Sequence, residues 1–548
     1  RDRFQRAVKP QPGAMGAACA CPGFEDSFEQ FLECCSASQQ VDADAEMVDE
    51  DGHTSLYLKG NPEALLRPLW LLVASFNAGD EAISLNDTWI PRKGLRDGST
   101  CYDLIVVAVQ EGILGGSVRF PRVDSHGDQL PPRHCNELLA EFLEHLGQDF
   151  RVVTVLSRGA MALLVFAWRY GPPWHNIETA AENTGVGHVF PNKGGLLAKL
   201  EVGGSSLCFI AAHLAAHTDH VQRRNEDVAE ILAGTKVSGM QPLDAPSHCH
   251  HSFFFGDLNY RLDLPKDSQS PEKETDALLS EAAEIDYILR QIHLGDYRSL
   301  LQYDQLHQEM ANGRVLQGFV SAVPSWPPTY RVMKGEEGFH FDTQRVPSYC
   351  DRVLKRSLPG YTNQLQLHGF HAAPEVSTSD HKPVSSVWSF TAAPILEASP
   401  SEAKDSWIRV SSLSATLGSA EGPVQLRCRS LPKVMEEVVV KCSTSSGSQV
   451  VFGGITLDLK VAKSKLDAVH LLLELSDVSE NYLGVAVIHC GAITRFEAPI
   501  LCYGELKGQL RGVLTDVSPK ADFDRFKPLG FRAEDKKMAR THMNTGEM

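Results

Sequence analysis

The sequence has no long, uninterrupted apolar segment. Its best candidate, Leu65–Phe76, is broken by Arg67 and Pro68, whereas a membrane-spanning helix needs about 20 predominantly apolar residues. The basic residues at the N-terminal end are not followed by the apolar stretch of a secretory signal. We therefore expect a soluble protein, neither secreted nor anchored by a spanning helix.

The chain also has fewer basic than acidic residues, and its cysteines lack the spacing of a disulfide framework. It has 52 Lys and Arg against 69 Asp and Glu, a formal net charge of −17. Such a field repels a nucleic-acid backbone, so we expect no nucleic-acid partner, and an anionic substrate needs a local positive site. The 13 cysteines are odd in number and scattered, which favours reduced thiols and a cytoplasmic location over a disulfide framework.

At 548 residues the chain exceeds one ordinary domain, so a large domain with at least one smaller one is expected. The N-terminal segment is rich in Pro, Gly and Ala, includes the acidic run Val41–Gly52 and has little periodicity, which favours disorder. The predicted divisions are a disordered or weakly structured segment 1–65, a large domain 66–392, a linker 393–405, a β-rich domain 406–517 and a tail 518–548.

The large domain has the texture of an α/β protein. Short apolar runs such as Leu69–Phe76 and Ser252–Leu258 alternate with amphipathic patterns at Arg133–Gly147 and Asp219–Gly234. Strands that are buried on both faces with helices outside predict two packed mixed sheets under helical layers. After residue 405, seven evenly spaced strand-like runs without intervening helices predict an all-β sandwich.

The segment Phe253–Asp263 is the most informative. Three phenylalanines end in Gly256 and are followed by Asp257 and Asn259, whose side chains point to the same side of an extended chain. On residue types alone, this is a core strand followed by an ordinary turn. What changes that interpretation is the set of polar groups found elsewhere in the same domain.

Two other strand ends carry oxygen ligands. Asn77 ends one apolar run and Glu111 ends the next. Mg²⁺ prefers oxygen and often takes only one or two ligands from protein, leaving water and substrate phosphate to complete its shell. Taken singly, each residue is more often an ordinary turn or solvated side chain.

Groups that can bind phosphate, or orient such groups, follow along the chain. Donors of this kind offset the charge on phosphate oxygens, which the acidic average of the chain cannot do. The candidates are Lys193, His213, Arg224, Asn225, Tyr330, Arg331, Asp351, Arg352, Asp380, His381 and Lys382.

The motifs FNAGD, VQE, NKGG, HLAAH, GDLNYR, PSYCDRVL and SDHKPV occur in this order, and with them the chain closely resembles the inositol polyphosphate 5-phosphatases. These belong to a superfamily of magnesium-dependent phosphodiesterases that includes DNase I and the abasic-site endonucleases. The resemblance covers about Leu69–Phe390. It implies a four-layer α/β sandwich, a Mg²⁺ cofactor and removal of the 5-phosphate from inositol rings. The implied substrates are phosphoinositides such as the 4,5-bisphosphate or 3,4,5-trisphosphate, with soluble inositol polyphosphates left open.

The resemblance also implies roles. Asp257 would orient and deprotonate the attacking water, and Asn259 would hold the water or the pentacoordinate phosphate. His381 would contact a non-bridging oxygen, with Asp351 fixing its imidazole. The remaining implied roles are these: Asn77 and Glu111 at the metal, Asp380 supporting the metal and its waters, His213, Arg224 and Asn225 supporting phosphate binding, Lys193, Tyr330 and Arg331 near a 4-phosphate, and Arg352 and Lys382 in the substrate-binding set.

The sequence departs from the family pattern before Asp351. The run Phe341–Val353 is short and lacks the usual Lys, so a 4-phosphate contact is either missing or supplied by Arg345. Tyr349 stands where Trp is usual, and Pro191 stands where Gly is usual. Substrate preference is therefore less well specified than the attack on phosphorus.

The C-terminal domain resembles a C2 domain, an arrangement similar to that of the SH2-containing 5-phosphatases. It is expected either to orient the active site on a bilayer or to act as a rigid support. Membrane association is expected to be peripheral, with Lys355, Arg356 and Lys382 in a basic face. Two rivals are a nuclease or sphingomyelinase-type phosphodiesterase on the same fold, and a phosphoinositide-binding scaffold without catalysis.

Overall fold

The computed structural model describes residues 46–48, 54–56, 58–112, 122–123, 129–130, 135–184, 193–237, 239–264, 274–396, 406–418, 423–446, 448–459, 461, 463–491 and 495–517. Most of the predicted disordered segment, much of the linker and the predicted tail lie outside these residues.

The end of the segment expected to be disordered or weakly structured makes contacts with the large domain. Leu58 is 3% exposed and exchanges backbone hydrogen bonds of 2.8 and 3.1 Å with Trp174. Just before it, β1 (Glu46–Val48) pairs with β2 (Thr54–Leu56). The large domain therefore begins earlier than residue 66. The sequence does not mark this start, because a single apolar side chain in a polar segment gives too weak a pattern.

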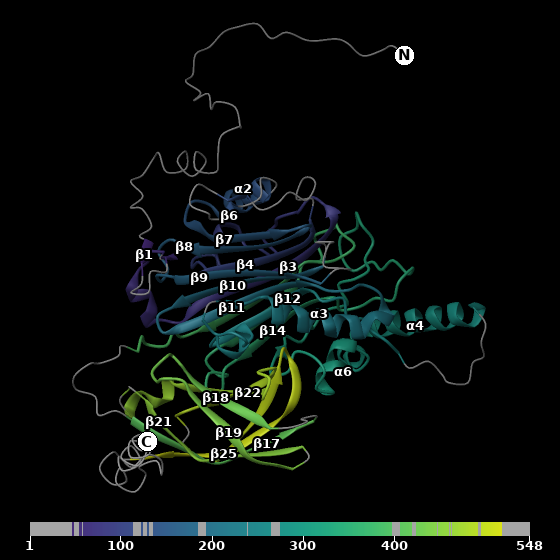
Figure 1. Cartoon of the computed structure of the whole chain (residues 1–548). Helices are drawn as coiled ribbons and strands as arrows, with labels where there is room; N and C mark the ends of the chain where they lie inside the picture. The colour runs from purple at the N-terminus through teal and green to yellow at the C-terminus, as the bar shows by residue number, and fades with distance from the viewer. Residues whose placement is uncertain are drawn as a thin grey trace, which may run out of the picture. The chain divides into compact units, whose positions relative to one another are not determined.

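The large domain contains two six-stranded mixed sheets, labelled in Figure 1. Each combines parallel and antiparallel neighbours, as predicted. The first sheet runs β13 (Val320–Ser321), β14 (Asp351–Ser357), β12 (His251–Asp257), β11 (Ser205–His213), β10 (Gly194–Val202), β9 (His175–Asn183). The second runs β15 (Gln366–Ala372), β16 (Val384–Phe390), β3 (Leu69–Glu81), β4 (Leu104–Gly112), β8 (Met161–Trp168), β7 (Phe150–Arg158).

The phenylalanine run of β12 explains how the sheets are held. Phe253 and Phe255 belong to the apolar core shared by the two sheets, and Phe253 stacks on Phe209 with ring centroids 5.2 Å apart. Phe254 faces the other way and joins the core beneath α3 (Val221–Gly234), which includes Ile231. A strand with apolar side chains on both faces is buried on both, as the sequence predicts.

Helices cover the outer faces. α2 (Cys135–Leu146) packs Phe142 against Phe166 of β8, with centroids 5.6 Å apart. Both helical patterns predicted from the sequence correspond to helices, α2 and α3. The other elements are α4 (Glu274–Leu294), α5 (Tyr297–Leu301), α6 (Gln305–Ala311), the short strands β5 (Arg122–Val123) and β6 (Gln129–Leu130), and the 3-10 turns η1 (Pro62–Leu66), η2 (Arg92–Gly94), η4 (Thr218–His220), η5 (Ala245–Ser247) and η6 (Lys463–Ala468).

The C-terminal domain is all-antiparallel. Its ladder closes on itself because β20 pairs with β17, so the expected sandwich is a barrel. The sequence predicts seven strands. It does not predict β20 or β24, because neither segment shows a clear alternation of apolar and polar residues. The strands are β17 (Ser406–Leu417), β18 (Val424–Leu431), β19 (Val438–Ser446), β20 (Gln449–Phe452), β21 (Ile455–Leu459), β22 (His470–Asp477), β23 (Tyr482–His489), β24 (Arg495–Cys502) and β25 (Glu505–Asp516).

The turn between β24 and β25 contacts the chain that follows α6. Gln317 donates a backbone hydrogen bond to Gly504 (2.9 Å), and Leu506 donates one to Gly313 (3.0 Å). A small apolar cluster adds Leu358 and Leu472. The barrel therefore contacts the large domain directly.

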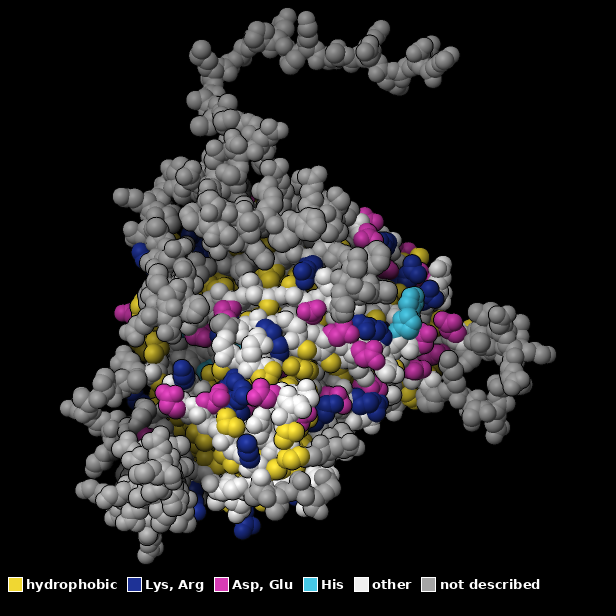
Figure 2. All heavy atoms as spheres, viewed as in Figure 1, with side chains coloured by type: hydrophobic (Ala, Val, Ile, Leu, Met, Phe, Trp, Pro, Cys, Tyr) yellow, Lys and Arg dark blue, Asp and Glu magenta, His cyan; other side chains and the backbone are white. Residues whose placement is uncertain are grey.

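The surface shows no segregation of charge on the face drawn in Figure 2, where acidic and basic side chains are interspersed. Among the described residues, no helix combines the length and apolar character needed to cross a membrane.

Candidate active site

The polar residues at the strand ends meet because of strand direction. β3 and β4 are parallel neighbours, as are β11 and β12. In the first sheet, Asp257 lies opposite His213 on one side and opposite Asp351 of β14 on the other. Asn77, four residues before the end of β3 in the second sheet, reaches Asp257 from across the gap between the sheets.

Asp257 lies at the centre and is 1% exposed. Its Oδ2 accepts from Asn77 Nδ2 (2.8 Å) and Asn259 Nδ2 (3.0 Å), and its Oδ1 accepts from the backbone N–H of Asn259 (3.0 Å). Gly256 makes the approach of β11 possible, since a Cβ there would lie 2.0 Å from the carbonyl oxygen of Ala212. The turn that the sequence predicts after the phenylalanine run thus holds the carboxylate that it predicts to be reactive.

The charges around Asp257 keep it ionised. Burial alone would raise its pKa, but the hydrogen bond from His213 and the positive charges of His381 and Lys193 outweigh burial and hold the pKa well below its usual range. An ionised carboxylate can accept a hydrogen bond from a water molecule and orient it, and it is in the protonation state that a general base requires.

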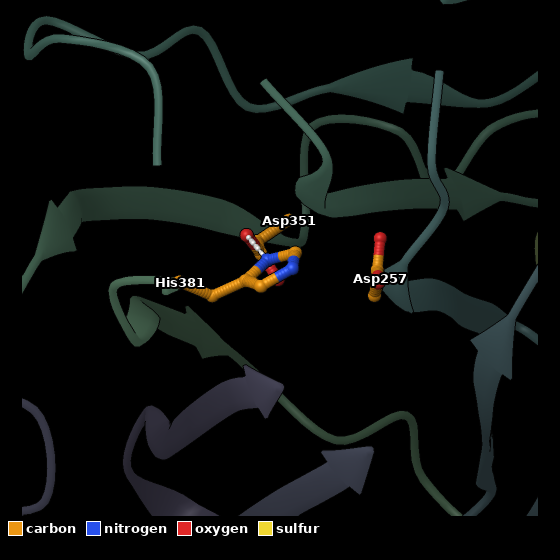
Figure 3. A group of neighbouring side chains, drawn as sticks. All are labelled: Asp257, Asp351 and His381. Carbon is orange, nitrogen blue, oxygen red and sulfur yellow. Dashed lines mark hydrogen bonds and ion pairs between the residues drawn. The ribbon is translucent and has the colours of Figure 1, made fainter. Parts of the chain in front are cut away.

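His381 faces Asp257 from the other side. Its Nδ1 lies 2.9 Å from Oδ2 of Asp351, which also accepts from the hydroxyl of Thr329 (2.7 Å). Figure 3 shows the imidazole between the carboxylates of Asp351 and Asp257. Burial opposes its charge, but Asp351, aided by Asp257 and Asp380, raises the pKa of His381 to about 9. At neutral pH this ring is an imidazolium that can donate to an anionic oxygen.

A third side of the site is formed by His213, Lys193 and Glu111. His213 Nε2 lies 3.3 Å from Asp257 Oδ2 and 3.5 Å from Glu111 Oε1, and hydrogen-bonds with Lys193 Nζ. Burial lowers the pKa of both His213 and Lys193. Two residues of the site, Glu111 and Asn259, have φ of 47° and 56°, a costly backbone region for non-glycine residues that occurs preferentially at functional sites.

Tyr330 and Arg331 lie beside the imidazole. The rings of Tyr330 and His381 are 4.6 Å apart. Arg331 Nε lies 3.2 Å from Asp342 Oδ2 and 3.4 Å from Asp380 Oδ2, and its side chain is 33% exposed. These residues therefore border the cluster on the side of His381 and Asp380. Arg345 is exposed, and Pro191 lies outside the described residues.

Two residues that the resemblance assigns to phosphate binding, Arg224 and Asn225, make hydrogen bonds to other groups of the protein. Arg224 is fully buried and donates to the carbonyl of Ala215 (3.1 Å) and to Gln305 Oε1 (2.6 Å). Asn225 donates to Glu309 Oε2 (2.6 Å). Both side chains tie α3 to α6, so their support of the site is indirect.

The expectation of open substrate-binding groups is corrected for Arg352 and Lys382. Arg352 points to the opposite face of β14 from Asp351, 2.7 Å from Asp304 Oδ2, and is 1% exposed. The buried Lys382 Nζ donates to three backbone carbonyls, the shortest at 2.7 Å to Val376. The alternation of side chains along β14 places Arg352 on the face opposite Asp351, but its buried partner Asp304 is distant in sequence.

The expected basic face is corrected too. Arg356 is 8% exposed and Lys382 is 0% exposed, so neither offers its charge to a lipid surface. Only Lys355 of the three expected residues is partly exposed.

Asn77 and Glu111 offer oxygen ligands of the kind that a hard cation prefers. Asn77 Oδ1 accepts one hydrogen bond, from Gly79 N (3.0 Å), and a carbonyl oxygen has a second lone pair. The Glu111 side chain is 38% exposed, so its carboxylate is accessible. Asp257, Asp351 and His381 also lie within ligating distance of one another, and a hydrogen bond of 2.9 Å joins Asp351 to His381 within that group.

Sequence reasoning missed two residues that hold the site together. Ser379 donates to the carbonyl of Asn77 (2.7 Å) and accepts from the backbone N–H of His381 (3.0 Å), linking β3 to the segment before β16. Arg261 donates to Asn259. Both lie within two residues of a predicted site residue, Arg261 at the end of the motif GDLNYR and Ser379 at the start of SDHKPV, but the sequence assigns neither of them a role.

Comparison with known proteins places this site in a known context. A sequence profile described as Endonuclease/Exonuclease/phosphatase family 2 matches residues 74–387. Phosphatidylinositol 3,4,5-trisphosphate 5-phosphatase 1 of Xenopus laevis is 26% identical over 339 residues, covering 58% of this chain and 30% of that protein. Type IV inositol polyphosphate 5-phosphatase 9 of Arabidopsis thaliana is 28% identical over 272 residues, covering 46% of this chain and 59% of that protein. The chain thus spans less than two thirds of the length of either relative.

One solved structure is also similar. It is the inositol polyphosphate 5-phosphatase domain of SPsynaptojanin in complex with inositol (1,4)-bisphosphate and calcium ion. It is 22% identical, with a TM-score of 0.45, and the match covers 61% of this chain and 85% of that one.

Proposed function

Because this chain belongs to endonuclease/exonuclease/phosphatase family 2, we propose that it is a metal-dependent phosphatase that removes the 5-phosphate of inositol compounds. The relatives named above carry that activity in their names. The observation that carries the proposal is the buried cluster in which Asn77 hydrogen-bonds Asp257, Asp351 hydrogen-bonds His381, and His213 lies between Asp257 and Glu111. It combines a base, a donor to phosphate oxygen and oxygen ligands for a cation.

In the proposed reaction each side chain has one task. Asp257 orients the attacking water and accepts its proton, held in place by the amides of Asn77 and Asn259. The imidazolium of His381 donates to a non-bridging oxygen of the scissile phosphate and offsets its growing charge. Mg²⁺ held by Asn77 and Glu111 would neutralise phosphate charge and polarise the water, with Asp380 supporting its water shell.

The proposed substrates are phosphoinositides that carry a 5-phosphate, the 4,5-bisphosphate and the 3,4,5-trisphosphate. Lys193, Tyr330 and Arg331 are the proposed contacts to the 4-phosphate. In support, Arg331 is partly exposed at the border of the cluster. Its planar fork can bind phosphate in a bidentate manner, whereas a lysine acts as a point charge.

We propose further that the protein is cytoplasmic and peripherally bound to membranes, with the C-terminal barrel acting as a C2-like accessory module. The backbone hydrogen bonds between the β24–β25 turn and the segment after α6 favour a supporting role for the barrel. Lys355 is the one partly exposed member of the expected basic face, so lipid contact through that face is less favoured than support.

The test is a side-by-side panel of phosphoinositides in vesicles and soluble inositol polyphosphates, assayed for phosphate release with Mg²⁺ and with EDTA. We expect Mg²⁺-dependent release only from compounds with a 5-phosphate. Binding without release would support the silent scaffold, and cleavage of nucleic acid or sphingomyelin would support the phosphodiesterase rival.

A further inference from the structure

Arg261 is a buried charge with an unusual set of partners. It follows β12 directly, two residues beyond Asn259, and is 7% exposed. Its Nε donates to the backbone carbonyl of Asn259 (3.1 Å), and its Nη2 donates to the side-chain Oδ1 of the same residue (2.5 Å). One guanidinium fork therefore grips one asparagine at both its backbone and its side chain.

This grip decides which atom of the Asn259 amide faces Asp257. A guanidinium can only donate, so Oδ1 must turn toward Arg261 and Nδ2 must turn away from it. Nδ2 then donates to Asp257 Oδ2 (3.0 Å) and to the carbonyl of Leu214 (3.2 Å). The reverse orientation would place the amide oxygen against an ionised carboxylate.

The same grip holds a strained backbone. Asn259 has φ of 56°, in the left-handed region that residues other than glycine adopt less readily. Its backbone N–H donates to Asp257 Oδ1 (3.0 Å), so relaxation of this φ would withdraw a donor from the base. The forked contact from Arg261 opposes that relaxation.

Arg261 also contacts Tyr330, whose ring lies beside that of His381. Its guanidinium carbon lies 4.4 Å from the centroid of the Tyr330 ring, and Tyr330 lies 4.6 Å from the His381 ring. A guanidinium over an aromatic face is attracted to it and limits its tilt. Arg261 thus contacts residues on both sides of the site: Asn259, which hydrogen-bonds Asp257, and Tyr330, which lies beside His381.

We propose that Arg261 is a positioning residue of this site, which orients Asp257 through Asn259 and His381 through Tyr330 without contacting the substrate. The inference rests on the proposed phosphatase function for its kinetic effect, and on the contacts alone for its structural effect. A residue that acts on geometry lowers kcat more than it raises KM, because it aligns reacting groups rather than binding the substrate.

The kinetic test compares Arg261→Gln and Arg261→Lys with Arg67→Gln as the matched control. Arg67 makes a comparable fork, to Asp103 at 2.6 and 2.8 Å, at the opposite end of β3. With a soluble inositol polyphosphate and Mg²⁺, we expect Arg261→Gln to lower kcat about 10- to 100-fold, with KM changed less than about threefold. Arg261→Lys should recover only part, because an ammonium cannot form the fork. Arg67→Gln should leave kcat unchanged.

A crystal structure of Arg261→Gln separates failure of this proposal from failure of the proposed function. We expect the Asn259 amide to rotate away from Asp257, or its φ to leave the left-handed region, whether or not the enzyme releases phosphate. An unchanged Asn259 would overturn the proposal, as would a kcat equal to that of the wild type. If the wild type releases no phosphate but Asn259 moves in the variant, the proposed function fails and the positioning role stands.

Discussion

Nδ1 of His381 lies 2.9 Å from Oδ2 of Asp351, and this contact leaves the other ring nitrogen free to face Asp257 (Figure 3). The carboxylate thus fixes both the orientation and the charge of the ring, since it raises the pKa of His381 to about 9 against the effect of burial. The site therefore presents an imidazolium and an ionised Asp257 at neutral pH.

Replacing Asp257 with Asn should remove the proposed base. We expect kcat for phosphate release to fall about 100- to 10,000-fold, the usual contribution of general base catalysis. Asp219→Asn is the control, because that side chain is 83% exposed. Near-wild-type hydrolysis by a folded Asp257→Asn variant, with thermal unfolding measured in parallel, would refute the proposed mechanism.

The pH dependence follows from the sign of the His381 shift. Its folded pKa of about 9 lies above its unfolded value, so its contribution to stability is complete below about pH 6.5 and is lost as pH rises through 9. We expect kcat to decline in that same basic range as the imidazolium loses its proton.

The variant Asp351→Asn tests the cause of that shift. Without the neighbouring negative charge, the pKa of His381 should fall, moving the basic limb of the kcat profile to lower pH by about one unit or more. Thr329→Val is the matched comparison, since it removes the hydroxyl that donates to Asp351 (2.7 Å) and keeps the carboxylate. A basic limb that stays in place in Asp351→Asn would show that another group controls it.

Glu111→Gln should weaken the metal site without abolishing the base. We expect the Mg²⁺ concentration for half-maximal activity to rise about tenfold or more, because a neutral amide binds a hard cation less well than a carboxylate. The exposed Glu497, which pairs with Arg511 at 2.7 Å, provides the control Glu497→Gln. Equal Mg²⁺ requirements for the two variants would remove Glu111 from the metal site.

Arg331→Gln tests the proposed 4-phosphate contact. A charge-assisted hydrogen bond contributes about 1.5–3 kcal/mol, so KM for the 4,5-bisphosphate should rise about tenfold or more. KM for the 3,5-bisphosphate, which lacks a 4-phosphate, should change little. An equal rise for both lipids would mean that Arg331 acts on the site through Asp380 rather than on the 4-phosphate.

Much of the site could be predicted from local sequence because strands have a fixed direction. Asn77, Glu111 and Asp257 each end an apolar run, and the ends of parallel strands meet at one edge of a sheet. The roles of Arg352 and Lys382 could not be predicted in this way. Their burial depends on Asp304 and on the carbonyl of Val376, partners that are distant in sequence or hidden in a turn.

The sequence by itself determined the α/β texture, the strand-end carboxylates and amides and the all-β C-terminal domain, because each follows from residue periodicity over a few positions. Only the tertiary structure decided which of the many cations face the site, because that depends on which side of a strand or helix meets which neighbour. It likewise decided that the barrel closes and that Arg261 and Ser379 hold the site together. Those contacts join chain segments whose proximity no local pattern encodes.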